Sequence, residues 1–283
     1  MKISEKYRRK KSFSFEIFPP KGDLSLEQAK TCLDQLAPLS PSFISVTYSA
    51  GGGGNSEKTI DIAEMIKNRY GIDSVAHLTC FNSDPETIRK NADLLKIKGV
   101  ENVLALRGDA AGEQQNSEFR HASDLIAFLK KHYDFCIGAA CYPEGHAQSE
   151  TLQQDIEALK IKQDAGADFF VSQLFFDNRY FYDFMDKALA SGINIPVCAG
   201  VMPILGKSQV ERMVYMCCAS LPSAIVRLLN KYENDPTSLR SAGIEYAANQ
   251  CWELSENGVA DVHIYTMNQP DIARTISDHI DQR

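Results

Sequence analysis

The feature that most constrains the fold is a series of eight short runs rich in β-branched and aromatic residues. Longer segments with helical hydrophobic spacing separate these runs, and several of them end at a glycine. Strands that alternate with helices in this way lie parallel and are joined by right-handed crossovers. The predicted strands are 13–18, 43–48, 74–80, 102–107, 136–142, 169–176, 196–202 and 261–267. The predicted helices include 26–36, 58–69, 85–98, 123–131, 151–164 and 180–190.

Eight such units in 283 residues fit a closed (β/α)₈ barrel better than an open doubly wound sheet. The runs are apolar on both faces, as buried parallel strands are. About sixty residues separate the seventh run from the eighth, and they carry extra helical patterns at 209–219, 223–232 and 238–257. We therefore predict one α/β domain over residues 1–283, a TIM-type barrel with extra helices between its seventh and eighth strands.

The composition excludes several classes of protein. Hydrophobic residues at 44% and charged residues at 24% are typical of a soluble globular chain. With 30 basic and 37 acidic residues the formal net charge is −7, which argues against a binder of nucleic acid or of anionic membranes. The longest uncharged apolar stretch, 193–205, contains two prolines and is too short to span a bilayer. No apolar segment follows the basic start, so we expect a cytoplasmic protein without a signal peptide.

The eight cysteines form no C-x-x-C pair, and the six histidines supply no zinc-ligand spacing beside them. We therefore expect reduced thiols and no metal site. The sequence leaves the oligomeric state open, a homo-oligomer included.

Barrel enzymes place their chemistry at the carboxyl ends of the strands. Glu16 stands in an apolar run between Phe15 and Ile17, where burial favours the protonated carboxyl that a general acid needs. The alternative is a structural glutamate paired with a basic side chain inside the barrel. His77, in the third run, is either a hydrogen-bonded core residue or a ligand contact.

The second predicted strand ends at Thr47 and Tyr48 and leads into a tetraglycine, 51–54. Its backbone amides can approach a phosphate or a flat ring, although a merely flexible loop is the competing interpretation. The fourth strand ends at Arg107 and Asp109, which either serve a ligand or cap neighbouring loops.

The fifth predicted strand ends with Tyr142 and His146 close together, an unusual concentration of chemistry for a bare connection. Gln173, at the end of the sixth, can present a donor and an acceptor to a flat heterocycle. None of the eight runs contains a lysine, which argues against a Schiff-base aldolase, and no serine lies in a G-x-S-x-G elbow.

Seven motifs in order resemble the methylenetetrahydrofolate reductase family in its compact bacterial form, and the resemblance covers nearly the whole chain. They are FEIFPP at 15–20, SVTYSAGG at 45–52, AHLTC at 76–80, ALRGD at 105–109, CYPEGH at 141–146, DAGAD with SQLFFD within 164–177, and IYTMN at 264–268.

The resemblance implies an FAD-containing barrel that reduces 5,10-methylenetetrahydrofolate to 5-methyltetrahydrofolate, in one-carbon metabolism and methionine supply. NAD(P)H would reduce the flavin and leave, and the folate would then take the hydride in a ping-pong scheme. Glu16 matches the family's acid, which protonates N10 of the folate. Asp109 matches a carboxylate beside the flavin that favours the cationic folate intermediate. A regulatory domain is not expected.

By the same carry-over, FAD contacts would come from Thr47, Tyr48, Ala50, His77, Arg107, Gly108, Asp109, Ala122, Tyr142, His146, Asp155 and Lys162. Substrate contacts would come from Glu16, Thr47, Gln173, Gln209 and Gln269. Family members often carry an arginine at the position of Gln269, and Ala158 and Ile161 replace polar residues on the flavin side. A phosphate-binding isomerase or lyase, and a non-catalytic subunit that holds flavin or a partner, remain as alternatives.

Overall fold

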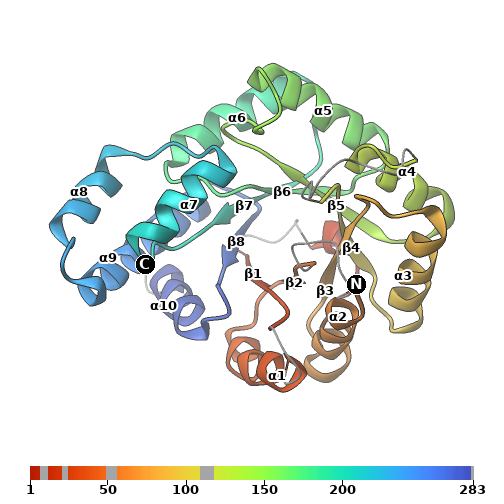
Figure 1. The fold of residues 1–283 in the computed structure, drawn as a ribbon, viewed down its shortest axis with the longest axis horizontal. Coiled ribbons are helices and arrows are strands. Elements are labelled where there is room, and N and C mark those ends of the chain that lie inside the picture. The colour runs from red at the N-terminus through yellow and green to blue at the C-terminus, as the bar shows by residue number, and fades with distance from the viewer. Residues whose placement is uncertain (7–11, 21–24, 49–55, 109–117, 282–283) are drawn as a thin grey trace.

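The computed structural model describes residues 1–6, 12–20, 25–48, 56–108 and 118–281. Within them, eight parallel strands follow one another in chain order around a closed barrel, and β1 pairs with both β2 and β8 (Figure 1). This confirms the predicted (β/α)₈ architecture. The strands are β1 (Phe13–Ile17), β2 (Ile44–Val46), β3 (Ser74–Thr79), β4 (Asn102–Leu106), β5 (Cys136–Cys141), β6 (Phe169–Ser172), β7 (Val197–Val201) and β8 (Asp261–Tyr265).

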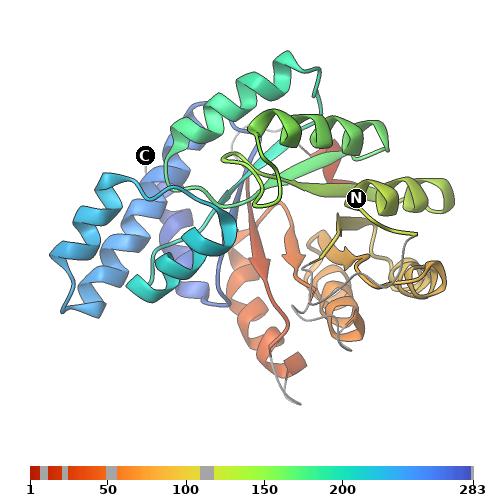
Figure 2. The ribbon, with the colours of Figure 1, turned by 45° about the horizontal axis from the view of Figure 1, so that its top comes forward.

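Helices alternate with the strands and surround the barrel, and the extra helices α7, α8 and α9 lie between β7 and β8 as predicted. Figure 2 shows these three helices together on one side of the molecule. The α-helices are α1 (Ser25–Leu36), α2 (Ser56–Tyr70), α3 (Pro85–Ile97), α4 (Ala122–His132), α5 (Leu152–Asp164), α6 (Asn178–Ala190), α7 (Lys207–Cys217), α8 (Ser223–Lys231), α9 (Pro236–Glu256) and α10 (Pro270–Asp281). Two 3₁₀ turns, η1 (Ile3–Glu5) and η2 (Ala37–Leu39), complete the set.

Local chemistry accounts for many of the helix boundaries. The Asp84 side chain accepts a hydrogen bond from the backbone of Thr87 at the start of α3, and Asp177 does the same for Arg179 at the start of α6. Gly71 follows α2 with φ of 67°, a conformation that disfavours any residue with a side chain. The predicted sixth strand is too long, because the chain leaves the sheet after Ser172 and buries Phe175 and Phe176 in the core instead.

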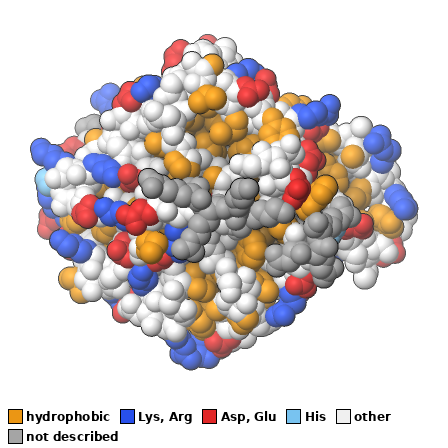
Figure 3. Space-filling model, turned by 180° about the vertical axis from the view of Figure 1, so that it is seen from behind, with side chains coloured by type: hydrophobic (Ala, Val, Ile, Leu, Met, Phe, Trp, Pro, Cys, Tyr) orange, Lys and Arg blue, Asp and Glu red, His pale blue; other side chains and the backbone are white. Residues whose placement is uncertain are grey.

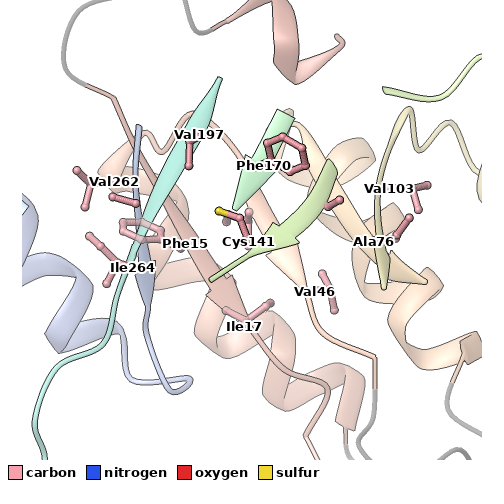
Figure 4. Packing of buried hydrophobic residues seen from close by; sticks show 14 of the residues in the cluster. Phe15, Ile17, Val46, Ala76, Val103, Cys141, Phe170, Val197, Val262 and Ile264 are labelled. Carbon is pink, nitrogen blue, oxygen red and sulfur yellow. The ribbon is translucent and has the colours of Figure 1, made fainter. Parts of the chain in front are cut away.

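The core has two layers, separated by the wall of the barrel. Alternate strand residues, such as Phe15 and Ile17 of β1, point outward and pack under the helices (Figure 4). The residues between them face the inside of the barrel, where Phe43, Leu104 and Phe169 belong to a second apolar cluster. Burial on both faces explains why the strands read as continuous apolar runs.

The amino-terminal turn η1 closes the bottom of the barrel. Ile3 is fully buried in the inner cluster, and its backbone N–H donates to the Asn102 side chain at 2.9 Å. Nearby, the Asp73 carboxylate accepts hydrogen bonds from Lys67 and the terminal amine and forms an ion pair with Lys6 at 2.6 Å. The basic start of the chain therefore supplies part of the ion network at this end.

Three further observations concern the described part of the chain. None of its helices combines the length and the apolar character needed to cross a lipid bilayer. It contains no group of three or more histidine, cysteine or acidic side chains placed to hold a metal ion. All eight cysteines are free thiols.

Candidate active site at the barrel mouth

A cavity of about 380 Å³ opens at the carboxyl ends of the strands, and we call it the inner cavity. Leu104, Leu106 and Val171 give it apolar walls. Figure 3 shows the face opposite to that of Figure 1, where hydrophobic side chains gather around a hollow. The predicted site residues that line the inner cavity are Glu16, Thr47, His77, Arg107, Gly108, Tyr142, His146 and Gln173.

A second cavity, of about 560 Å³, adjoins the first between the ends of β4 and β5 and the helices α4 and α5. We call it the outer cavity. It shares Leu106, Arg107, Ala140, Tyr142 and His146 with the inner cavity, so the two form one continuous site. The outer cavity adds three further predicted contacts, Ala122, Asp155 and Lys162.

Glu16 enters the inner cavity from β1, with 21% of its side chain exposed. One carboxylate oxygen lies 3.5 Å from Nε2 of His77 and 3.8 Å from Nε2 of His263. No arginine or lysine among the described residues forms an ion pair with Glu16. The carboxyl group stands between two imidazoles and the open cavity.

His77 is only 7% exposed, although it lines the cavity. Burial lowers the pKa of His77 to about 4, and the neighbouring Glu16 carboxylate offsets only part of that effect. Its Nε2 atom makes no hydrogen bond to the described residues. His77 is therefore neutral at physiological pH and leaves a ring nitrogen available to a ligand.

Two cations, Arg107 and Lys162, line the outer cavity together with the carboxylates of Asp124 and Asp155. Lys162 donates to the backbone oxygen of Ala140 at 2.8 Å, which is its one hydrogen-bond acceptor among the described residues, and its ammonium lies 5.8 Å from the centroid of the Tyr142 ring. Burial lowers the pKa of this ammonium below its usual value. Arg107 lies on the same wall and donates to Gln148 at 2.6 Å. An anionic ligand would complete the bonding of both cations.

Asp155 organises the loop after β5. Its two carboxylate oxygens accept from the backbone N–H of His146 at 2.8 Å and from the hydroxyl of Ser149 at 2.9 Å. The Tyr142 and His146 rings meet edge to face, with centroids 4.6 Å apart. The structure thus uses the Asp155 carboxylate to hold the loop that carries two other predicted contacts.

Gly108 and Gln173 follow β4 and β6, and both line the inner cavity. Gly108 has φ of 92°, and a Cβ there would lie 3.2 Å from Cβ of Thr79, so glycine is required at this turn. The Gln173 side-chain oxygen accepts from the backbone of Leu174 at 2.9 Å. Its amide nitrogen has no partner among the described residues and faces a cavity it lines.

Three predicted residues lie outside both cavities. Tyr48 follows β2 but lines neither of them. Gln209 uses both ends of its amide locally, accepting from the backbone of Leu205 and donating to that of Pro203. Gln269 accepts from Arg240 of α9 at 2.8 Å. Ala50 and Asp109 fall outside the described residues, as does the tetraglycine loop.

Two residues of β8 were missed by the sequence reasoning. Tyr265 lines the inner cavity and donates to the backbone oxygen of Ser172 at 2.7 Å, and burial raises its pKa well above the usual value. Its place at a strand end, within the motif at 264–268, was a usable signal. His263 lies one layer deeper, and only its distance from Glu16 in three dimensions reveals it.

The site combines three chemical features. The outer cavity has cations that suit the phosphates of a dinucleotide, and the inner cavity has apolar walls with polar groups at its rim that suit a flat heterocycle. Glu16 can give or take a proton at the floor of that inner space. The residues present therefore fit a flavin dinucleotide.

Comparison with known proteins gives consistent results. The family model described as methylenetetrahydrofolate reductase matches residues 2–281. Methylenetetrahydrofolate reductase 1 of Schizosaccharomyces pombe is 36% identical over 280 residues, 95% of this chain and 46% of that protein. The 5,10-methylenetetrahydrofolate reductases of Pectobacterium carotovorum and Escherichia coli are 34% and 33% identical over 263 residues, 93% of this chain and 88% of each.

Among solved structures, an uncharacterized protein from Clostridium thermocellum that binds two copies of 5-methyl-5,6,7,8-tetrahydrofolic acid has a similar fold. The TM-score is 0.68 at 14% sequence identity, and the match covers 99% of this chain and 98% of that one. This likeness independently supports the barrel.

Proposed function

The chain belongs to the methylenetetrahydrofolate reductase family, and from that premise we propose that it reduces 5,10-methylenetetrahydrofolate to 5-methyltetrahydrofolate with electrons from NAD(P)H. The observation that carries the proposal is the position of Glu16, an acid without an ion-paired lysine or arginine among the described residues, at the floor of a cavity that opens into a cation-lined one. A barrel of the same fold binds a methylated folate, which agrees with this substrate class.

FAD would occupy both cavities. Arg107 and Lys162 would meet its phosphates in the outer cavity, and the apolar wall of the inner cavity would hold its ring system. When bound, FAD supplies two-electron chemistry between the nicotinamide donor and the folate. The protein contributes orientation, the exclusion of water and the movement of a proton.

Glu16 would protonate N10 of the folate, which opens the five-membered ring to an N5 iminium, the electrophile of the reaction. His77 beside it is neutral and carries no extra proton. Glu16 is therefore the group that donates the proton to the substrate nitrogen. Asp109, by its motif, would favour that cationic intermediate.

Gln173 would orient both substrates in turn, because its amide can donate to one and accept from the other. Gln209 and Gln269 remain proposed folate contacts. For Gln209, contact requires release of the two bonds that it makes to the backbone at 203–205.

Anaerobic stopped-flow measurement tests the proposal. The protein is reconstituted with FAD and mixed with NADH or NADPH, and the visible absorbance of oxidised flavin should disappear. The reduced protein is then mixed with 5,10-methylenetetrahydrofolate, and that absorbance should return as 5-methyltetrahydrofolate forms. Failure to bind FAD would favour a phosphate-binding isomerase or lyase. Flavin binding without transfer to folate would favour a non-catalytic subunit.

A further inference from the structure

A column of polar side chains runs through the inside of the barrel beneath the inner cavity. Asp261 Oδ1 lies 2.5 Å from the hydroxyl of Ser14, which lies 2.7 Å from Nδ1 of His263. All three residues are buried, with exposures of 1% or less. Three polar groups in direct succession within an apolar interior form a continuous hydrogen-bonded path.

The upper end of this path is the acid of the proposed reaction. Nε2 of His263 lies 3.8 Å from Glu16 and 3.1 Å from the hydroxyl of Ser45. Phe43 stacks on the imidazole with a centroid distance of 5.3 Å and an interplanar angle of 18°, which fixes the ring. A side-chain rotation that moves the Glu16 carboxylate oxygen by about 1 Å would bring it within hydrogen-bond distance of Nε2 of His263.

The lower end of the path approaches the bottom surface of the barrel. The second oxygen of Asp261 accepts from Ser12 at 2.6 Å and from Ser42 at 2.7 Å. Both serines are only partly buried. Water can therefore approach Asp261 from the end of the barrel opposite the cavities.

Two hydrogen-bond patterns satisfy the column. In the first, the protonated Asp261 donates to Ser14, Ser14 donates to Nδ1 of His263, and Nε2–H lies between the Ser45 hydroxyl oxygen and an ionised Glu16 that moves to accept from it. In the second, every bond is reversed, Asp261 is ionised and Glu16 is protonated. The two patterns differ by one proton carried from Asp261 to Glu16. Each step breaks one O–H or N–H bond and forms another, so no electrons are transferred.

We propose that Asp261, Ser14 and His263 form a proton relay that recharges Glu16 from the opposite end of the barrel while folate covers the mouth. The proposal rests on the function proposed above, in which each turnover consumes one proton. Folate in the inner cavity would separate Glu16 from bulk water. Burial raises the pKa of Asp261 despite the hydrogen bonds from its serines, and this favours the protonated form that donates to Ser14.

Other titratable groups also face the column. Within the described residues these are His77 on β3, Tyr265 above His263 on β8, Cys198 beside Asp261 on β7, and Lys6, which donates to the backbone of Ser42. His77 is neutral above pH 4, and burial keeps the Tyr265 phenol protonated. The relay residues and Glu16 therefore carry the proton change.

The first test compares two identical substitutions. Ser14→Ala interrupts the path between Asp261 and His263, whereas Ser42→Ala removes a hydroxyl from the same Asp261 and leaves Ser12 and every step from Asp261 to Glu16 in place. Reduced enzyme and folate are mixed in a single turnover between pH 6 and pH 9. We expect full fast-phase amplitude in the parent and in Ser42→Ala, and an amplitude in Ser14→Ala that falls as the pH rises. An unchanged pH profile in Ser14→Ala would overturn the relay.

The second test needs no bound flavin or substrate. Infrared spectra of the ligand-free protein near neutral pH should contain the carbonyl band of a protonated carboxylic acid that Asp261→Asn removes and Ser42→Ala retains. Absence of such a band at every pH down to acid unfolding would contradict the relay. If Ser14→Ala does not fold, Asp261→Asn takes its place in the kinetic test.

Failure of the relay differs from failure of the proposed function. Reduction of the bound flavin by the nicotinamide donor does not use Glu16 and should be normal in every variant. A parent protein that transfers nothing to folate refutes the function. A parent that transfers normally, with an Asp261→Asn variant of identical pH profile, refutes the relay alone.

Discussion

The two ends of the barrel differ in how far the hydrogen bonds of their titratable groups are completed by the protein. At the bottom, Asp73 is surrounded by Lys6, Lys67 and the terminal amine, and Asp261 is bonded to three serine hydroxyls. At the mouth, Lys162 has one protein acceptor, and Nε2 of His77 has none among the described residues.

An incompletely bonded buried group costs stability, commonly about 1–3 kcal/mol. The carboxylates of Asp73 and Asp261 at the bottom avoid that cost, and Lys162 and His77 at the mouth accept it where a ligand would supply the missing partner. The difference matches the general division of the fold, in which the bottom serves stability and the top serves catalysis. Substitutions at the two ends should therefore separate loss of activity from loss of stability.

The largest effect is expected for Glu16→Gln. We expect folate reduction to fall by about 10² to 10⁴, because the amide cannot supply the proton, while FAD binding and reduction by the nicotinamide donor persist. Single-turnover kinetics measures both half-reactions. Glu144→Gln, the same change at a mouth carboxyl that binds the backbone of Ser220, serves as the control and should react like the parent. A near-normal folate rate in Glu16→Gln would make Glu16 structural.

Gln173→Leu comes next, with a loss of up to about 3 kcal/mol of transition-state stabilisation in each half-reaction, because the substrate's polar edge is left unpaired. Gln173→Glu retains the acceptor for Leu174, loses the donor and adds a negative charge, so it should impair both half-reactions as well. Steady-state kinetics of the parent should give the parallel double-reciprocal lines of a ping-pong scheme. An effect on folate alone, with donor oxidation untouched, would show that the substrates do not share Gln173.

At the bottom, Asp73→Asn should cost about 2 kcal/mol of unfolding free energy at pH 7 and leave both half-reactions unchanged. Burial opposes ionisation of Asp73, but the hydrogen bonds from Lys6, Lys67 and the terminal amine outweigh it and lower the pKa to about 2. The folded carboxyl thus binds its proton at lower pH than the unfolded one. Its contribution is present above about pH 4 and is lost as the pH falls through 2.

Urea unfolding of the parent and Asp73→Asn as a function of pH checks this. The two curves should converge on acidification. Glu101→Gln, which removes the exposed partner of the same lysine, should change stability by less than about 1 kcal/mol. Equal stability of Asp73→Asn and the parent at pH 7 would contradict the assigned role of the bottom network.

The smallest effect is expected for Asp109→Asn, proposed from its motif alone. Loss of a negative charge beside the flavin should raise its two-electron potential by about 30 mV, which equals roughly 1.4 kcal/mol. Transfer to folate should slow correspondingly. Spectroelectrochemical titration gives the potential, and an unchanged potential with an unchanged folate rate would remove Asp109 from the site.

The sequence predicted the barrel well because strand periodicity and strand-end chemistry are local properties. Glu16 and Arg107 could be placed at the mouth from strand-end motifs, and Lys162 from the family resemblance. The contacts between elements could not, because the partners of a side chain depend on the register of strands far apart in the chain. Gln209 shows this limit, since its bonds to the 203–205 backbone depend on the turn before α7.

The polar column was missed for the same reason. Ser14 reads as an ordinary strand residue, and Asp261 as a strand start. Only the pairing of Ser14 with His263 across the β1–β8 seam brings them together. The buried position of Ile3 was equally invisible, because a short polar-flanked start carries no periodic signal.

The seam between β1 and β8 also has a kinetic consequence. The Ser14 bonds to Asp261 and His263 join residues 247 and 249 positions apart, so they are among the least local contacts in the molecule. Closing so long a loop carries a large entropic cost, and such contacts form late in folding. During synthesis the seam cannot form until the last strand has left the ribosome. Glu16 is synthesised early, in β1, but its neighbour His263 belongs to the last strand, β8. A truncated or partly folded chain would therefore contain Glu16 without the residues that surround it in the native site.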